Sequence, residues 1–337
     1  MRVNRVLGAV VAGCALISFW ASAMAGDALR MNQIQVVGTH NSYHVKPPAK
    51  LLEAQTEITS EAAGFGYSHA PLDVQLDRGV RSLEIDVHAD PSGTRVFHVP
   101  VVDEGSTCAR LVDCLEVVRG WSEKHPSHVP ILILVETKEK EFPLVREPDF
   151  DAAALDQMDK EIRSVLEPGR LLTPDAVRKE APTLSEAVTT KGWPTLKESR
   201  GKVMLVLHAR GRIAETYTKD RPSLESRAMF LESQPDKPYA AVFIRNNPAE
   251  KGIQDLLQRG YIVRTRADAN LFGSSRDNEQ RRDVALASGA QVLSTDFPAG
   301  EAAPGTGYEV RLPEGYPARC NPVLAPGACD NAALEAP

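Results

Sequence analysis

Acidic residues at two points of the sequence have the type and spacing that bind a divalent cation. Glu84 and Asp86 alternate with apolar residues, so both face one side of an extended strand, and Glu136 ends another apolar run. Converging carboxylates repel one another unless a cation compensates them. Oxygen ligands without cysteine or an HExxH helix favour calcium or magnesium over zinc. The amide of Asn41 is a candidate neutral ligand.

Two histidines have the chemistry for proton transfer beside these carboxylates. His40 follows one apolar run and His98 follows another. An imidazole with a pKa near ~6.5 gives or takes a proton at neutral pH. His88 shares a strand face with Asp86. Two interpretations remain for His88: it takes part in catalysis, or it only braces the acidic pair. The remaining histidines are interpreted as structural or unassigned: His44, His69, His125, His128 and His208.

Polar residues end five of the apolar runs, at positions 39–42, 84–88, 136–138, 264–268 and 294–296. A single charged strand end is usually a solvated or salt-bridged group, for which Lys138, Arg264 and Arg266 offer partners. Five such ends favour a shared pocket, because the carboxyl ends of parallel barrel strands face one mouth.

The runs that position these residues are short, and their apolar residues are nearly continuous, as in strands covered on both faces. We expect strands at Gln33–Thr39, Arg81–Val87, Ile131–Thr137, Lys202–Leu207, Ala240–Arg245, Tyr261–Thr265 and Gln291–Thr295. We expect helices at Pro71–Arg78, Ala109–His125, Asp151–Leu166 and Ala249–Arg259. This alternation predicts an α/β fold that closes into a distorted TIM-type (β/α)8 barrel, with a doubly wound open sheet as the alternative.

Residues 1–25 have the layout of a secretory signal peptide. Arg2 and Arg5 precede the apolar run Val6–Trp20, and Ala23-Met24-Ala25 is a small-x-small cleavage site. A transmembrane anchor is the weaker interpretation because the run is short, and lipoprotein processing at Cys14 is weaker still. We therefore expect a secreted or periplasmic protein.

The remaining chain of about 310 residues suits one large barrel. We expect the barrel over residues 26–300, with a helical insertion on its top at about 141–200, and an irregular extension over 301–337. Four cysteines form two close pairs, which predict the disulfides Cys108–Cys114 and Cys320–Cys329 in an oxidising compartment. A zinc site is the alternative, but paired CxxC spacing is lacking.

The net charge of −6 argues against a nucleic-acid partner and gives no general attraction to anionic lipid. We expect a monomer, which would have to meet any lipid substrate or membrane surface through local patches. The sequence contains no G-x-S-x-G elbow of a serine hydrolase, no P-loop and no G-x-G-x-x-G nucleotide motif.

The order of these motifs resembles that of the phosphoinositide-specific phospholipase C family. The matching residues are His40-Asn41-Ser42-Tyr43, Glu84-x-Asp86, Val96-Phe97-His98 and Val135-Glu136. In that family a His-Asn closes the first barrel strand, a Glu-x-Asp closes the second, a histidine follows about a dozen residues later, and a Glu closes the third. Its bacterial calcium-dependent branch is also similar at Gly38–Tyr43, Tyr261–Ala269 and Ala287–Phe297, and the similarity runs from about Gln33 to Phe297.

The resemblance implies a calcium-dependent cleavage of phosphatidylinositol-type lipids to a cyclic inositol phosphate and diacylglycerol. The implied calcium ligands are Asn41, Glu84, Asp86 and Glu136. His40 or a ligand carboxylate takes the proton of a sugar hydroxyl that attacks phosphorus, and His98 protonates the departing oxygen. Arg266 and Lys138 are expected to hold phosphate or ring hydroxyls.

Three alternatives remain open from the sequence. Glycerophosphodiester phosphodiesterases share the barrel and the Glu-x-Asp…His pattern, but carry arginine where this chain has Asn41. Sphingomyelinase-D-like enzymes are a further barrel relative with another polar group as substrate. A non-catalytic secreted calcium- or carbohydrate-binding barrel belongs to a different class, and it predicts a lost histidine, whereas His40 and His98 are both present.

Overall fold

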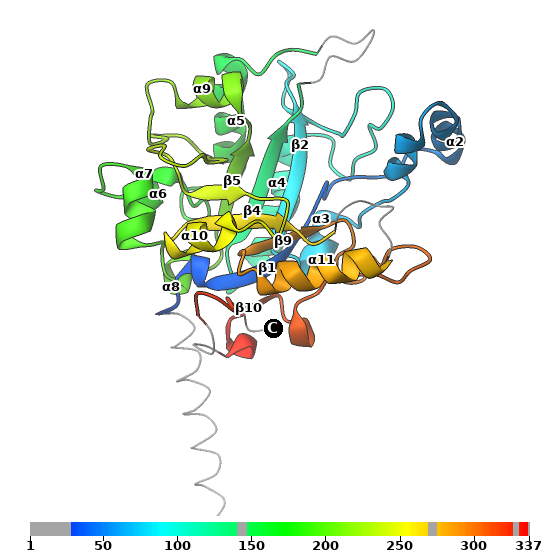
Figure 1. The fold of residues 1–337 in the computed structure, drawn as a ribbon. Coiled ribbons are helices and arrows are strands. Elements are labelled where there is room, and N and C mark those ends of the chain that lie inside the picture. The colour runs from blue at the N-terminus through cyan, green and yellow to red at the C-terminus, as the bar shows by residue number, and fades with distance from the viewer. Residues whose placement is uncertain (1–27, 140–146, 269–274, 326–329, 336–337) are drawn as a thin grey trace, which may run out of the picture.

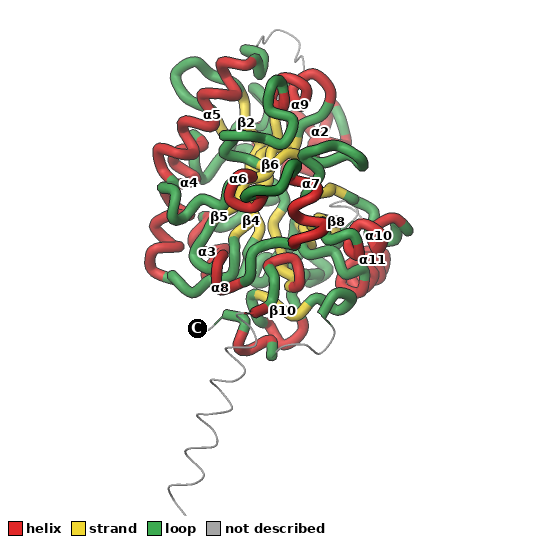
Figure 2. The backbone as a smooth tube through the Cα atoms, turned by 90° about the vertical axis from the view of Figure 1, so that its left-hand side faces the viewer, coloured by secondary structure: helices red, strands yellow, loops and turns green. Residues whose placement is uncertain are grey.

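The centre of the molecule is a parallel sheet that closes almost completely into a barrel (Figure 2). The computed structural model describes residues 28–139, 147–268, 275–325 and 330–335. Its parallel strands follow the spatial order β6-β5-β4-β2-β1-β9-β8-β7, and a parallel bridge between Glu232 and Val242 joins the two ends. The strands are β1 (Ile34–Thr39), β2 (Ser82–His88), β4 (Ile131–Thr137), β5 (Val203–His208), β6 (Phe230–Leu231), β7 (Val242–Ile244), β8 (Ile262–Arg266) and β9 (Val292–Thr295).

Helices cover the outside of this barrel (Figure 1). They are α2 (Ala49–Ile58), α3 (Leu72–Asp77), α4 (Leu111–Lys124), α5 (Ala152–Val165), α6 (Pro174–Arg178), α7 (Leu184–Glu186), α8 (Leu196–Ser199), α9 (Gly211–Thr218), α10 (Gly252–Gln258) and α11 (Ser275–Ala287). Helix α4 buries Leu111, Leu115 and Val118, which recur every three to four residues along one helix face. The TIM-type fold class, the seven expected strands and the four expected helices are confirmed.

The barrel is distorted at the seam between β1 and β2. These strands pair at Gly38 and Ser82, where a Cβ on Gly38 would come within 2.7 Å of the Ser82 Cβ, so only glycine allows the approach. The first half of β1 instead pairs antiparallel with β10 (Ala318–Cys320). Val36 lies opposite Val292 of β9 on one edge and opposite Ala318 of β10 on the other. Strand β10 therefore occupies the edge that β2 leaves free.

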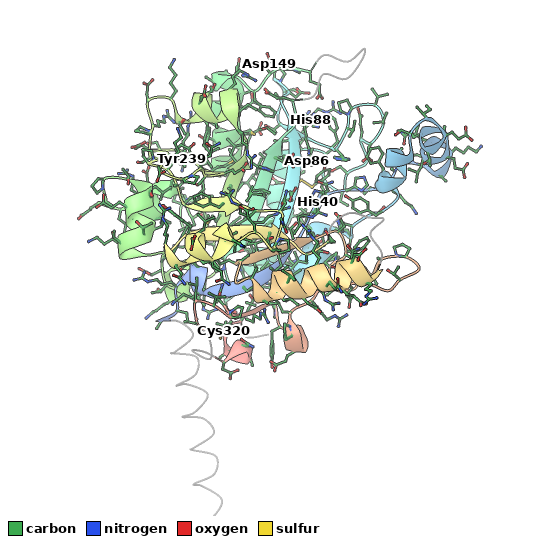
Figure 3. The ribbon with its side chains drawn as sticks, in the orientation of Figure 1. His40, Asp86, His88, Asp149, Tyr239 and Cys320 are labelled. Carbon is green, nitrogen blue, oxygen red and sulfur yellow. A yellow bond between two sulfur atoms is a disulfide. The ribbon has the colours of Figure 1, made fainter. Side chains whose placement is uncertain are left out.

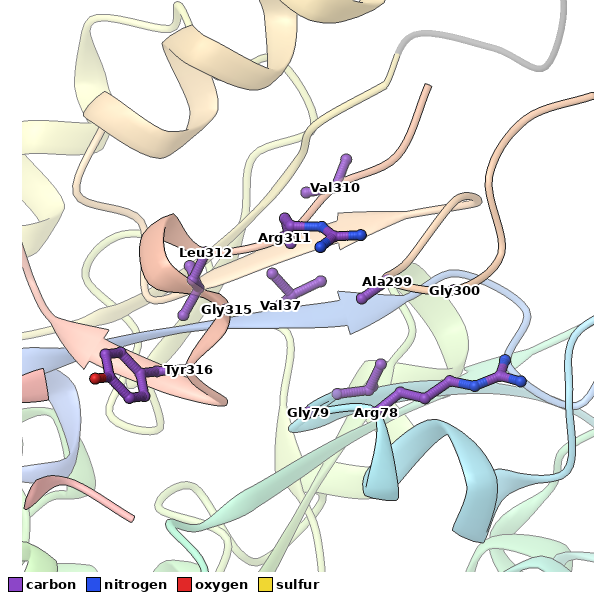
Figure 4. Close-up of a pocket in the computed structure, with 11 residues that line it drawn as sticks. Val37, Arg78, Gly79, Ala299, Gly300, Val310, Arg311, Leu312, Gly315 and Tyr316 are labelled. Atoms are coloured by element: carbon purple, nitrogen blue, oxygen red, sulfur yellow. The ribbon is translucent and has the colours of Figure 1, made fainter. Parts of the chain in front are cut away.

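The described part of the C-terminal segment packs against the base of the barrel and contributes the short strand β10. Leu312 and Leu334 are buried, and Glu335 accepts hydrogen bonds from Arg81 and from the backbone N–H of Val129. Three-residue β10 is too short to show a strand pattern in the sequence. A pocket of about 290 Å³ lies where this segment crosses the seam, and none of the expected catalytic or metal-binding residues lines it (Figure 4).

The connection from β4 to β5 also differs from the expected insertion on the barrel top. Helix α5 packs on α4 as an ordinary crossover helix. Further along, Leu196 N donates to Leu29 O, and Thr195 forms a bridge with Arg30, just before the start of β1. This part of the connection therefore lies at the end of the barrel opposite the carboxyl ends of the strands.

The disulfide Cys108–Cys114 is confirmed. Cys320 is also disulfide-bonded, while its expected partner Cys329 and the expected signal peptide lie outside the described residues. Among the described residues, no helix has both the length and the apolar character needed to cross a membrane.

Candidate active site

Three carboxylates from neighbouring strands converge at the carboxyl end of the barrel. Glu84 and Asp86 lie on β2, and the register of the sheet sets Asp86 beside Glu136 of β4. One oxygen from each of the three carboxylates lies within 4.8 Å of the others, so the group can hold one cation. Figure 3 shows Asp86 and His40 in the upper part of the molecule, far from Cys320 at its base.

The three carboxylates differ in the direction in which the site shifts their pKa. Burial raises the pKa of Asp86 to about 6, and Glu136 and Glu84 add to this against the opposing charge of Lys138. Burial acts the same way on Glu84, but Arg264 and His40 hold its pKa below the ordinary value. Burial of Glu136 is likewise outweighed by His208 and Lys138, so the pKa of Glu136 is lowered. Asp86 is thus the carboxylate that most needs a bound cation to ionise.

Asn41 presents its amide through an uncommon backbone conformation. Its φ of 47° is left-handed, which asparagine tolerates better than most residues. The Nδ2 group donates to the Tyr67 hydroxyl at 3.1 Å, while Oδ1 is buried with no hydrogen-bond partner among the described residues. Asp86 Oδ1 is likewise buried and without a hydrogen bond. Buried oxygens of this kind fit a hard cation such as Ca²⁺.

His40 lies next to the carboxylate group and is held on two sides. Its Nδ1 is 2.8 Å from Asp296 Oδ1, and its Nε2 is 3.5 Å from Glu84 Oε1. The His40 carbonyl accepts a hydrogen bond from His69 Nε2 at 2.9 Å. Burial of Asp296 is outweighed by Arg266 and His40, which keep its pKa low. The ionised Asp296 therefore favours a hydrogen on His40 Nδ1 and leaves Nε2 as the free ring nitrogen.

His98 approaches the same group from the loop after β3 (Arg95–Val96), a short strand paired with β2. Its Nδ1 lies 2.8 Å from Asp103 Oδ2, and the ring is close enough to Asp86 to act on the pKa of that carboxyl. His40 and His98 therefore both lie beside the group formed by Glu84, Asp86 and Glu136.

Lys138 and Arg266, the expected substrate-binding cations, are engaged by acidic partners. Lys138 Nζ lies 2.9 Å from Glu136 Oε1, beside the carboxylate group itself. Arg266 Nη2 lies 2.7 Å from Asp268 and 2.6 Å from Asp296. Both side chains lie at the site, and Arg266 reaches His40 through Asp296.

Two site residues were missed by the sequence reasoning. His208 Nδ1 is 3.6 Å from Glu136 Oε2, and His208 Nε2 is 3.2 Å from Glu232, which Arg210 also contacts. Glu136, Lys138, His208 and Glu232 help to line a pocket of about 320 Å³. His208 ends an expected strand, so the strand-end rule could have found it. Glu232 follows the two-residue β6, which leaves no pattern.

His88 braces the site, which decides between its two open interpretations. The ring is buried, stacks on Phe97 with centroids 3.6 Å apart, and contacts Glu147 and the Phe97 carbonyl through its two nitrogens. Burial lowers the pKa of His88. With both nitrogens engaged, His88 supports the loop that leads to His98.

Comparisons with known proteins agree with this geometry. The family model described as "Phosphoinositide phospholipase C, Ca2+-dependent" matches residues 29–95 and 91–322. No curated protein sequence matches the chain.

Solved structures with a similar fold include two bacterial enzymes. One is the calcium-dependent phosphoinositol-specific phospholipase C of a Gram-negative Pseudomonas species in its myo-inositol complex, with 19% identity over 89% of this chain and 99% of that chain and a TM-score of 0.58. The other is the Ca²⁺-dependent phosphatidylinositol-specific phospholipase C of Streptomyces antibioticus, with 20% identity over 80% and 95% of the two chains and a TM-score of 0.55. At these identities the likeness shows the barrel fold.

Proposed function

The chain belongs to the Ca²⁺-dependent phosphoinositide phospholipase C family and is a phosphodiesterase that cleaves phosphatidylinositol-type lipids, and we propose that His40 and His98 perform the proton transfers around the Glu84–Asp86–Glu136 carboxylates. The observation that carries this proposal is the convergence of the three carboxylates, with His40 Nε2 3.5 Å from Glu84. The products are a cyclic inositol phosphate and diacylglycerol.

Asn41, Glu84, Asp86 and Glu136 are the residues that hold calcium in this proposal. The buried atoms Asn41 Oδ1 and Asp86 Oδ1 support it, because neither has a hydrogen-bond partner among the described residues and a cation can bind both. Bound Ca²⁺ supplies charge neutralisation for the phosphate and lowers the pKa of the attacking hydroxyl. Magnesium is the weaker candidate, since a buried group of protein oxygens with flexible geometry suits the larger ion.

The two histidines take opposite roles in the proton transfers. His40, held at Nδ1 by Asp296, accepts through Nε2 the proton of the inositol hydroxyl next to the phosphate. That hydroxyl oxygen forms the new bond to phosphorus as the bond to the diacylglycerol oxygen breaks. His98 donates its proton to the diacylglycerol oxygen. Deprotonation and protonation thus occur at separate atoms on opposite sides of the reacting phosphorus.

The inositol ring is assigned to the pocket of about 320 Å³ beside Glu136. Lys138, His208 and Glu232 line it and supply both donors and acceptors, which suits a ring that carries many hydroxyls. Arg266 of β8 does not line this pocket and instead binds Asp296. Its role toward the phosphate of the substrate is to neutralise negative charge.

The lipid surface is met by an apolar rim, defined here as Leu51, Ile58 and Val101. Their exposed fractions are 41%, 87% and 62%. Leu51 and Ile58 lie on α2, which projects from the upper edge of the barrel (Figure 1). Gln55 of the same helix donates to Val102 O at 2.6 Å, so the rim is joined to the loop beside His98. Contact through such side chains needs no positive surface charge.

The protein is proposed to act after export, as a secreted or periplasmic monomer with no nucleic-acid partner. The Cys108–Cys114 disulfide supports export, because disulfides persist in oxidising compartments.

The proposal is tested by incubating the purified protein with phosphatidylinositol, phosphatidylcholine and glycerophosphoinositol, with Ca²⁺, Mg²⁺ or a chelator. Release of cyclic inositol phosphate that requires Ca²⁺ is expected from the inositol lipid. Release of glycerol phosphate or choline phosphate without any inositol phosphate would move the assignment to another phosphodiesterase. The double variant Glu84→Gln, Asp86→Asn is the matched inactive control.

A further inference from the structure

Asp103 lies between two histidines that come from different parts of the chain. Its Oδ2 is 2.8 Å from His98 Nδ1, and both of its oxygens are 2.9 Å from His44 Nε2. His44 is fully buried and Asp103 is 1% exposed, whereas His98 reaches solvent. We call these three residues the His98–Asp103–His44 triad. Asp103 and His44 lie outside the carboxylate group and have no part in the mechanism above, in which His98 is the acid.

The triad determines which nitrogen of His98 can react. Burial of Asp103 is outweighed by the hydrogen bonds from His44 and His98, so its pKa is lowered and it accepts from both rings. His98 must then carry a hydrogen on Nδ1, and its Nε2, which bonds to no described residue, is the nitrogen left for substrate. His44 uses its Nε2 hydrogen on Asp103, and no described residue bonds to its Nδ1.

The same three residues could hold a metal ion, since one ligand atom of each lies within 4.8 Å of the others. The observed separations of 2.8 and 2.9 Å are those of direct hydrogen bonds. Ligand atoms around a tetrahedral zinc ion, with bonds of about 2.0–2.2 Å, stand further apart, at roughly 3.3 Å. The distances therefore favour a hydrogen-bonded triad.

The backbone fixes Asp103 in this position from two sides. His98 N and Val99 N both donate to the Asp103 carbonyl, at 3.2 and 3.0 Å, which closes the loop between the two side chains. Beyond the loop, Val45 N donates to Gly105 O, and a Cβ on Gly105 would lie 2.0 Å from Val45 O. The loop is thus docked against the segment that carries Asn41 and His44.

We propose that Asp103, locked by His44, is a positioning residue that keeps the Nδ1 hydrogen of His98 in place and aims Nε2 at the departing diacylglycerol oxygen. The inference rests on the proposed function. In the step, the hydroxyl oxygen–phosphorus bond forms and the phosphorus–glycerol oxygen bond breaks. The proton on His98 Nε2 passes to the glycerol oxygen, and His98 regains a proton from solvent.

The test compares two substrates that differ in their need for an acid. Water-soluble short-chain phosphatidylinositol has an alkoxide leaving group that must be protonated, whereas p-nitrophenyl inositol phosphate releases a stable phenolate. We expect Asp103→Asn to slow the lipid by roughly 10²-fold or more and the nitrophenyl ester by less than about threefold. His44→Gln gives the same pattern with a smaller loss, and Glu104→Gln, in the same loop, leaves both rates unchanged.

A loss of equal size on both substrates, or no loss on either, would overturn the assignment. A wild-type protein inactive on both substrates would refute the proposed function instead, and ¹⁵N spectra of the histidine rings then decide the inference. In spectra of the neutral ring, the form left after Nε2 has given up its proton, wild-type His98 is expected as the Nδ1–H tautomer, with Nε2–H appearing in Asp103→Asn. An unchanged tautomer in that variant, or stoichiometric zinc in the wild type that His44→Gln loses, would contradict the triad.

Discussion

Lys138 Nζ lies 3.0 Å from Asp86 Oδ2, so a cation of the protein already stands beside a carboxylate proposed to bind calcium. Lys138→Met removes this competing charge, and we expect Ca²⁺ to bind roughly tenfold more tightly, since unit charges at this range interact by more than about 1 kcal/mol. Calorimetric titration measures the change. Lys179→Met, at a well-exposed lysine far from the site in sequence, is the control. Unchanged or weaker binding in Lys138→Met would contradict this account.

The two histidines proposed for proton transfer are expected to tolerate replacement structurally but not functionally. His40→Ala and His98→Ala each lower kcat by roughly 10²- to 10⁴-fold, because each removes one proton transfer. Circular dichroism and thermal unfolding should match the wild type, since both rings are partly exposed. His125→Ala serves as the control, because His125 directly follows the C-terminal end of α4 and has no assigned role in the site. A rate near that of the wild type in either variant removes the assigned role from that residue.

Calcium binding is expected to weaken below about pH 6. The pKa of Asp86 is about 6, above the ordinary 3.8, so the carboxyl must release a proton before it can bind the ion. Between pH 7 and pH 5 the affinity should fall about tenfold, with about one proton released per ion at pH 5. Titrations in buffers of different ionisation enthalpy measure both quantities. Asp86→Asn should bind weakly and lose this pH dependence.

The same raised pKa affects stability in the absence of calcium. The folded protein keeps a proton on Asp86 between about pH 4 and pH 6, where the unfolded chain has released it. The free energy of unfolding therefore decreases as pH rises through this window, and urea unfolding with a chelator present should show it. Added Ca²⁺ should reverse the trend at the upper end, because it binds the ionised form.

The apolar rim is expected to matter on membranes alone. The double variant Ile58→Asp, Val101→Asp should lose activity on phosphatidylinositol vesicles by about tenfold or more, because charged side chains resist insertion between lipid head groups. Activity on short-chain monomeric lipid should stay within about twofold. Val284→Asp, at an exposed valine on α11, is the matched control. Equal losses on vesicles and monomers would instead indicate damage to the site.

Most of the barrel and its chemistry could be predicted from the sequence, because long apolar runs ending in charged residues are a local signal. Glu84 and Asp86 follow this rule, and so does His208 in hindsight. Strand β6 and strand β10 could not be predicted, since each holds two or three residues and depends on neighbours far along the chain. Asp103 was missed for a related reason: it follows no strand, and only the folded loop brings it to His98 and His44.

The base of the barrel should depend strongly on Glu335. It accepts from Arg81 Nε at 2.9 Å and from Val129 N at 2.9 Å, and both partners are buried. Glu335→Ala leaves the Arg81 charge buried and unpaired, so we expect the free energy of unfolding to fall by about 3–5 kcal/mol. Chemical denaturation measures this, and Glu314→Ala, at an exposed turn, should change it little. A loss below about 1 kcal/mol would show that the base tolerates the unpaired arginine.

The pairing of β1 with β10 has a consequence for how the protein acquires its shape. Strand β1 begins at residue 34, yet its partners at Val36 are Val292 of β9 and Ala318 of β10. A nascent chain therefore cannot complete this part of the sheet until residue 318 has been made. We expect the barrel to close only after that point, so the chain stays open for the transport across a membrane that the proposed export requires.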